Sequence, residues 1–168
     1  MPLQTLLVRD KMNMLQEERN EKLLSGEGEM KTVEAPKILI ADDDPDVLRV
    51  MEKRIKADGY RVVKAQDGLE AWAKICSELP DVIVLDLVMP GLDGFSVLEK
   101  LRNQPAVKKW QPVIIVSARG ELEDMKKGFS LEADHYIMKP CQMEEVLKAI
   151  TLMLNLLPQR KHPSELEP

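Results

Sequence analysis

Short apolar runs alternate with longer amphipathic segments along residues 36–157. Five of the runs have the length of buried strands; they cover residues 37–41, 60–65, 82–85, 113–116 and 135–138. After each run, apolar residues recur at three- or four-residue spacing, which predicts a helix with one buried face. These five helices are expected over residues 45–57, 69–79, 95–102, 121–131 and 142–157.

Turn and capping residues support the predicted helix boundaries. Asp44 can cap the first helix and Pro45 can occupy its first turn, while Asp58-Gly59 is a typical stop. The spacing in the second helix predicts four inward-facing side chains, which are Trp72, Ile75, Cys76 and Leu79.

Strict alternation of strands and helices predicts parallel strands joined by right-handed crossovers. Five such units in a stretch of this length favour an α/β fold of the flavodoxin-like, doubly wound kind. We therefore expect a five-stranded parallel sheet of order 2-1-3-4-5 between two helical layers, in three layers α/β/α. Ligands of such sheets bind at the carboxyl ends of the strands, where the strand order reverses. Here that point is the end of strands one and three.

The flanks differ from the middle of the chain. Residues 1–35 are charge-mixed and end in a Gly- and Glu-rich stretch, which predicts an N-terminal extension and linker, in part helical. Residues 158–168 hold three prolines and several charges, which is typical of a disordered tail. No apolar stretch reaches membrane-spanning length, so we expect a cytoplasmic protein that does not bind membranes. The net charge of −5 argues against direct nucleic-acid binding.

Carboxylates follow the two strands at the expected ligand edge. Asp42 and Asp43 come directly after the first strand, and Asp86 comes directly after the third. Three converging carboxylates repel one another unless a cation lies between them, and oxygen ligands of this kind suit Mg²⁺. The alternative for the first pair is a solvated turn that caps a helix. The adjacent Asp86 favours the metal site.

Two further strand ends carry polar groups. Lys139 follows the fifth strand and can supply a positive charge to Asp86, and Ser117 ends the fourth strand with a hydroxyl. A metal ion, a lysine and a hydroxyl around one carboxylate suit phosphoryl transfer onto that carboxylate. The chain has neither a Walker loop nor a kinase glycine loop, so the phosphoryl group must come from a phosphorylated protein or a small acyl phosphate.

Four motifs together resemble the receiver domain of two-component response regulators, in particular single-domain receivers of the chemotaxis type. They are Ile38–Pro45, Leu85–Gly94, Val116–Ala118 and Tyr136–Pro140, in the family's order and spacing. The resemblance covers residues 36 to about 157, which we expect to form the receiver domain.

The resemblance implies a role for each matching residue. Asp86 is implied as the phosphoacceptor and Lys139 as the family's lysine, whose bond to Pro140 is often cis in relatives. The implied Mg²⁺ ligands are Asp42, Asp43, Asp86 and the backbone carbonyl of Val88.

Two residues match the positions through which the family switches state. Ser117 is implied as the hydroxyl that turns toward the phosphoryl group, and Tyr136 as the aromatic ring that moves with it. A half-buried core tyrosine is an equally good interpretation of Tyr136.

The resemblance also implies the partners. The donor is expected to be a histidine kinase or a histidine phosphotransfer protein, and the chain is expected to be a signalling module rather than an enzyme, with Mg²⁺-dependent self-phosphorylation and self-dephosphorylation at Asp86. No effector domain is recognisable, so the output is expected to be a changed surface that binds an unknown target protein. An alternative is that the chain is a receiver fragment of a larger regulator or hybrid histidine kinase.

Two surfaces could join two copies in a homodimer. Leu152 and Leu156 form a second apolar strip on the last predicted helix, beyond what one buried face needs. The N-terminal segment offers a broken apolar face, formed by Leu3, Leu6, Leu7, Met14 and Leu15. Its alternative is a disordered extension.

Two other interpretations fit less well. An aspartate-nucleophile phosphatase needs a second acid two residues after Asp86, where this chain has Val88. A degenerate receiver that only binds partners would lack the acidic pair or Lys139, and both are present.

Overall fold

The computed structural model describes residues 34–104, 110–120 and 122–156. Strands and helices alternate along them, and no bound differs from the predicted one by more than one residue. In chain order they are β1 (Lys37–Ala41), α2 (Pro45–Ala57), β2 (Arg61–Ala65), α3 (Gly68–Glu78), β3 (Val82–Leu85), α4 (Gly94–Asn103), β4 (Val113–Ser117), α5 (Leu122–Ser130), β5 (His135–Met138) and α6 (Met143–Leu156).

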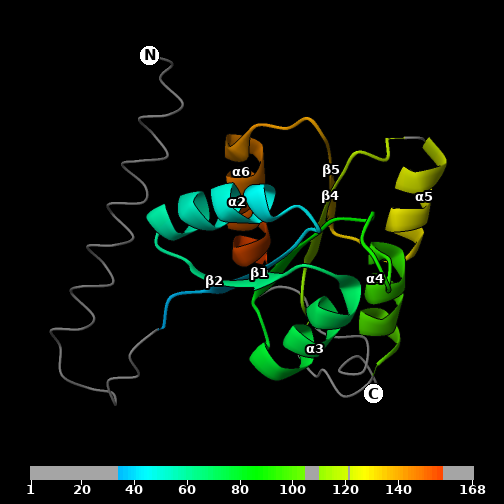
Figure 1. Cartoon of the computed structure of the whole chain (residues 1–168), viewed down its shortest axis with the longest axis horizontal. Helices are drawn as coiled ribbons and strands as arrows, with labels where there is room; N and C mark the ends of the chain where they lie inside the picture. The colour runs from blue at the N-terminus through cyan, green and yellow to red at the C-terminus, as the bar shows by residue number, and fades with distance from the viewer. Residues whose placement is uncertain (1–33, 105–109, 121, 157–168) are drawn as a thin grey trace, which may run out of the picture. The chain divides into compact units, whose positions relative to one another are not determined.

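The strands form one sheet of order β2-β1-β3-β4-β5, and every neighbouring pair is parallel (Figure 1). The predicted fold class and strand order are therefore confirmed. The order reverses between β1 and β3, so the carboxyl ends of these two strands lie side by side.

Helices cover both faces of the sheet and create two apolar layers. Side chains of α2 and α6 pack on one face, against alternate residues such as Ile40 and Val84. Side chains of α3 and α4 pack on the other face, against Leu39 and Leu85. The central strand β3 is buried along its whole length, as expected for a parallel strand covered on both sides.

Helix starts agree well with the sequence, and one predicted helix face is partly wrong. The Asp44 side chain caps α2 and accepts hydrogen bonds from the backbone N–H groups of Asp46 and Val47.

In α3, Ile75 is buried, but Cys76 and Leu79 are exposed. Leu79 terminates the helix in the left-handed conformation, at φ 47°, and so leaves the helical face that its spacing suggested.

The last helix carries the expected second apolar strip. Leu152 and Leu156 are exposed on α6, while Val146 and Ile150 on the same helix are fully buried.

The predictions for residues 1–33 and 158–168 lie outside the described residues, so the division of the chain at residues 35 and 157 stays a prediction. Within the described ranges, no helix has the length and apolar character needed to cross a bilayer.

Candidate functional site

Two buried carboxylates lie at the edge where the strand order reverses. Asp42 follows β1 and Asp86 follows β3, and their side chains are almost completely buried. The backbone N–H of Asp86 donates to the carbonyl of Ala41 at 2.9 Å, which extends the pairing of β1 and β3 by one residue. Sheet pairing therefore fixes the position of Asp86 relative to the end of β1.

The start of α4 packs closely against the backbone of Asp86. A Cβ atom at Gly94 would lie 2.2 Å from the carbonyl oxygen of Asp86, far closer than such atoms can come. The Gly94 N–H also donates to the carbonyl of Leu87 at 3.1 Å. Only glycine fits here, because any side chain would push α4 away from the segment that carries Asp86.

Asp42, Asp43 and Asp86 form a compact acidic cluster. One carboxylate oxygen from each residue lies within 4.8 Å of the other two. Asp42 and Asp86 are buried and Asp43 is exposed, so the cluster opens to solvent on one side. An all-oxygen donor set with one open side suits a hard cation that keeps part of its water shell, and Mg²⁺ is such a cation. The residues present therefore fit a magnesium ion.

Lys139 connects the two buried carboxylates. Its Nζ donates to Asp42 Oδ2 at 2.6 Å and to Asp86 Oδ2 at 2.7 Å. Burial by itself lowers the pKa of Lys139, but the hydrogen bonds to Asp42 and Asp86 outweigh burial and raise the pKa above its ordinary value. The positive charge of Lys139 is therefore stabilised, although a single positive charge does not balance three carboxylates. The Lys139–Pro140 peptide bond is cis.

Backbone groups hold the second oxygen of each buried carboxylate. The N–H of Asp44 donates to Asp42 Oδ1 at 2.9 Å, and the N–H of Val88 donates to Asp86 Oδ1 at 3.0 Å. With Lys139 on the Oδ2 atoms, both carboxylates have a fixed orientation before any ligand arrives. The sequence predicted Asp44 as a cap and Val88 as a ligand, but not these two N–H contacts.

Ser117 and Tyr136 belong to a second group, next to the carboxylates, and both contact Arg119. The N–H of Arg119 donates to Ser117 Oγ at 3.3 Å, and the hydroxyl of Tyr136 donates to the carbonyl of Arg119. Ser117 is fully buried and Tyr136 is half-buried against the core. Burial raises the pKa of Tyr136, and the negative charge of Asp124 adds to this effect. No sequence signal pointed to Arg119 as the link between the two residues.

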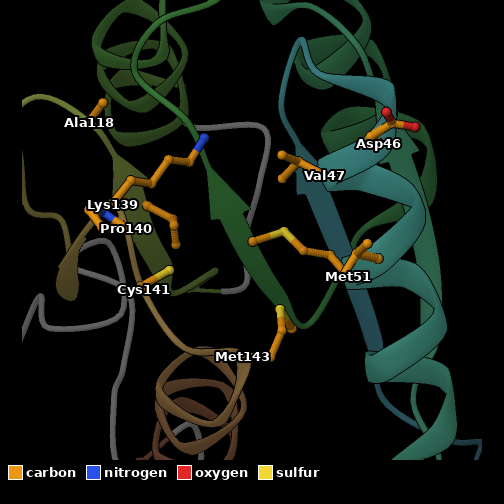
Figure 2. A pocket seen from close by; sticks show the side chains of 10 residues that line it. Asp46, Val47, Met51, Ala118, Lys139, Pro140, Cys141 and Met143 are labelled. Atoms are coloured by element: carbon orange, nitrogen blue, oxygen red, sulfur yellow. The ribbon is translucent and has the colours of Figure 1, made fainter.

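An apolar groove of about 640 Å³ opens beside Lys139, between α2 and the start of α6. Figure 2 shows the sulfur-bearing side chains of Met51, Cys141 and Met143 along it, with Lys139 and Ala118 at one end. Val50, also in the lining, is 54% exposed. The groove therefore offers a partner an apolar surface that shares Lys139 with the carboxylate site.

Comparison with known proteins identifies this arrangement. The family model described as "Response regulator receiver domain" matches residues 38–151. The chain belongs to this family. Receiver domains are signalling modules rather than classical enzymes, and they take their phosphoryl group from a histidine kinase or another phosphoryl donor.

Several curated relatives match this receiver. A probable transcriptional regulator, ycf27, of Guillardia theta is 38% identical over 70% of the chain and 45% of its own length. The transcriptional regulatory protein PrrA of Mycobacterium tuberculosis is 38% identical over 73% of the chain and 51% of its own length. The chain thus spans about half the length of the curated relatives it matches.

Solved receiver structures match over nearly their whole length. A CheY-like receiver domain protein from Methanospirillum hungatei superimposes with a TM-score of 0.69 at 29% identity, covering 74% of this chain and 98% of that one. The receiver domain of the Francisella response regulator 1452 gives a TM-score of 0.67 at 35% identity, covering 71% and 97%. The receiver fold is thus shared with both structures.

Proposed function

We propose that this receiver accepts a phosphoryl group on Asp86 from a histidine kinase or a histidine phosphotransfer protein, and from small acyl phosphates in vitro. The observation that carries the proposal is the environment of the Asp86 carboxylate. It is buried, oriented by Lys139 and the Val88 N–H, and one of its oxygens lies within 4.8 Å of the carboxylate oxygens of Asp42 and Asp43. A carboxylate that only stabilised the fold would not need two acidic neighbours.

We further propose that Asp42, Asp43, Asp86 and the backbone carbonyl of Val88 hold Mg²⁺. When bound, the ion supplies positive charge to the phosphoryl oxygens during transfer. Lys139 supplies the same kind of charge from the protein side. Asp43 is the exposed member of the cluster, which suits exchange of the ion with solvent.

The transfer itself needs one bond to form and one to break. An oxygen of Asp86 bonds to phosphorus while the donor's P–N bond, or the P–O bond of an acyl phosphate, breaks and the electron pair leaves with the donor. We propose that the Ser117 hydroxyl then turns toward the phosphoryl oxygens. This movement would release the Arg119 N–H from Ser117 Oγ, and the Arg119 carbonyl would carry the change to Tyr136.

The metal requirement gives the first test. Incubation with acetyl phosphate and Mg²⁺ is expected to add one phosphoryl group to the wild-type protein, measured by intact mass. Chelation with EDTA is expected to abolish the addition, because the charges on the acidic cluster and the phosphoryl group then repel. Asp43→Asn is expected to raise the Mg²⁺ concentration needed for half-maximal labelling. Equal labelling with and without Mg²⁺ would contradict the metal site.

We also propose that the donor protein seats on the apolar groove beside Lys139. Val50→Glu places a charge on this surface, and transfer from a phosphorylated donor protein is expected to slow at least tenfold, since about 1.4 kcal/mol of lost docking energy has this effect. Labelling by acetyl phosphate is expected to stay at the wild-type rate, because a small donor needs no docking surface.

Leu79→Glu is the matched control for the groove. Leu79 is 57% exposed at the carboxyl end of α3, outside the groove. Transfer from the donor protein is expected to be normal in this variant. If Val50→Glu and Leu79→Glu slow transfer equally, the groove is not the donor surface.

The output of the receiver rests on finer proposals. We propose that phosphorylation changes a surface on α6 at Leu152 and Leu156, and that this surface binds the target protein or a second copy of the chain. The expectation of a receiver that acts without its own effector domain stays a prediction, as does its alternative, a receiver within a larger regulator. The curated relatives described above carry the names of transcriptional regulators.

A further inference from the structure

One methionine differs from the others in the described part of the chain. Met138 is 55% exposed, whereas the remaining described methionines are buried or half-buried; these are Met51, Met89, Met125, Met143 and Met153. A peroxide must reach the sulfur of a thioether to oxidise it, so an exposed methionine is more susceptible than a buried one. We therefore expect a dissolved oxidant to reach Met138 first among the described methionines.

The sulfur of Met138 lies directly on the loop between β4 and α5. A Cβ atom at Gly120 would come within 2.0 Å of Met138 Sδ and 3.1 Å of Met138 Cγ. The thioether thus fills the space that a side chain at residue 120 would take. Because Met138 ends β5 and precedes Lys139 in the chain, this contact ties the loop to the strand end that carries the lysine.

The same loop carries the contacts of the two predicted switch residues. Arg119, the neighbour of Gly120, accepts the hydrogen bond from Tyr136 and donates to Ser117. Strand β5 therefore touches this loop in two places, through the Tyr136 hydroxyl and through the Met138 thioether. A change at Met138 acts on the loop without touching the carboxylates.

We propose that Met138 is an oxidation site through which a peroxide-class oxidant lowers phosphoryl uptake at Asp86. The sulfur gives up two electrons to hydrogen peroxide, one peroxide oxygen becomes the sulfoxide oxygen, and the other leaves as water. The sulfoxide is more polar and bulkier than the thioether, so it cannot keep the close contact with Gly120. The loop shifts away from β5, and the Ser117 and Tyr136 hydroxyls lose their contacts with the Arg119 backbone.

Peptide mapping after limited treatment with hydrogen peroxide tests the site. Among the described methionines, we expect Met138 to gain an oxygen before Met125 and Met143. This part is independent of the proposed function, and Asp86→Asn is expected to oxidise at Met138 in the same way. Equal or faster oxidation of Met125 or Met143 would overturn the assignment.

Labelling by acetyl phosphate with Mg²⁺ tests the consequence, which rests on the proposed function. Oxidised wild-type protein is expected to label severalfold more slowly, and methionine sulfoxide reductase is expected to restore the rate. Met138→Leu keeps the other methionines. When this variant is treated in parallel, its labelling rate is expected to stay the same after oxidation. If oxidised wild type and oxidised Met138→Leu respond equally, Met138 is not the sensor. Failure of the untreated protein to label would instead contradict the proposed function.

Gly120→Ala gives a second test without any oxidant. The added methyl group displaces the Met138 thioether from the loop, while the backbone conformation at residue 120 accepts alanine. Labelling by acetyl phosphate is expected to slow severalfold, the same effect that is expected after oxidation of the wild type. Wild-type labelling by this variant would show that the contact does not affect the site.

Discussion

Replacing Asp86 with asparagine is expected to abolish phosphoryl uptake and at the same time to stabilise the fold. An amide has no carboxylate oxygen for the acyl phosphate bond, so labelling by acetyl phosphate falls to background. The substitution also removes one of three clustered negative charges. In the absence of Mg²⁺, the free energy of unfolding is expected to rise by about 1 kcal/mol, because the removed repulsion outweighs the loss of the Asp86–Lys139 contact, and Lys139 keeps its contact with Asp42. Intact mass and urea denaturation in EDTA measure the two effects.

Asp58→Asn is the matched control, because Asp58 is an exposed residue at the end of α2, outside the acidic cluster. It is expected to label like the wild type and to unfold within experimental error of it. Phosphoryl uptake by Asp86→Asn would contradict the assignment of the acceptor. A lower free energy of unfolding for Asp86→Asn in EDTA would contradict the repulsive cluster.

Lys139→Met is expected to have the opposite effect on stability. The methionine leaves Asp42 and Asp86 buried without their cation, and losing one partner of a buried charge pair costs about 3–5 kcal/mol. The Lys139 side chain is 25% exposed, so solvent screens part of this cost. We therefore expect the free energy of unfolding in EDTA to fall by about 2 kcal/mol. Mg²⁺ is expected to recover part of this loss by occupying the cluster. Labelling by acetyl phosphate is expected to fall about a hundredfold, as when other oriented charges are removed from a reacting site.

Two comparisons make this prediction specific. In the double variant with Asp86→Asn, part of the lost stability is expected to return, because one unpaired charge is gone. Lys74→Met removes a surface lysine paired with Glu70 one helical turn away and is expected to change stability by less than about 0.5 kcal/mol. If the stability changes of Lys139→Met and Asp86→Asn, measured by urea denaturation, are strictly additive in the double variant, there is no charge interaction between Lys139 and Asp86.

The fold was predictable because parallel sheets make strong local patterns. The run Val82–Leu85 is apolar throughout, as expected for a strand that is covered on both faces. In the structure it is the central strand β3, and all four residues are buried. Once the strand order is known, the carboxyl ends of β1 and β3 must be neighbours. The expected gathering of Asp42, Asp43, Asp86 and Lys139 therefore follows from topology, and the structure brings these side chains together.

Contacts that depend on loop paths and close backbone packing were not predictable. The bonds of Arg119 to Ser117 and Tyr136 use its backbone, which carries no residue-specific signal. The contact of Met138 with Gly120 depends on how the loop after β4 folds over β5. The exposed position of Leu79 depends on the left-handed turn at the helix end, which helical spacing does not register.

The central claim is that Asp86 is the acceptor, and chemical trapping tests it most directly. Borohydride reduces an acyl phosphate to an alcohol, so a phosphorylated aspartate becomes homoserine at its own position. After labelling with acetyl phosphate and Mg²⁺, reduction and peptide sequencing by mass spectrometry are expected to find homoserine at residue 86. Homoserine at residue 42 or 43, or a stable phosphate on Ser117 with Asp86 unchanged, would contradict the account.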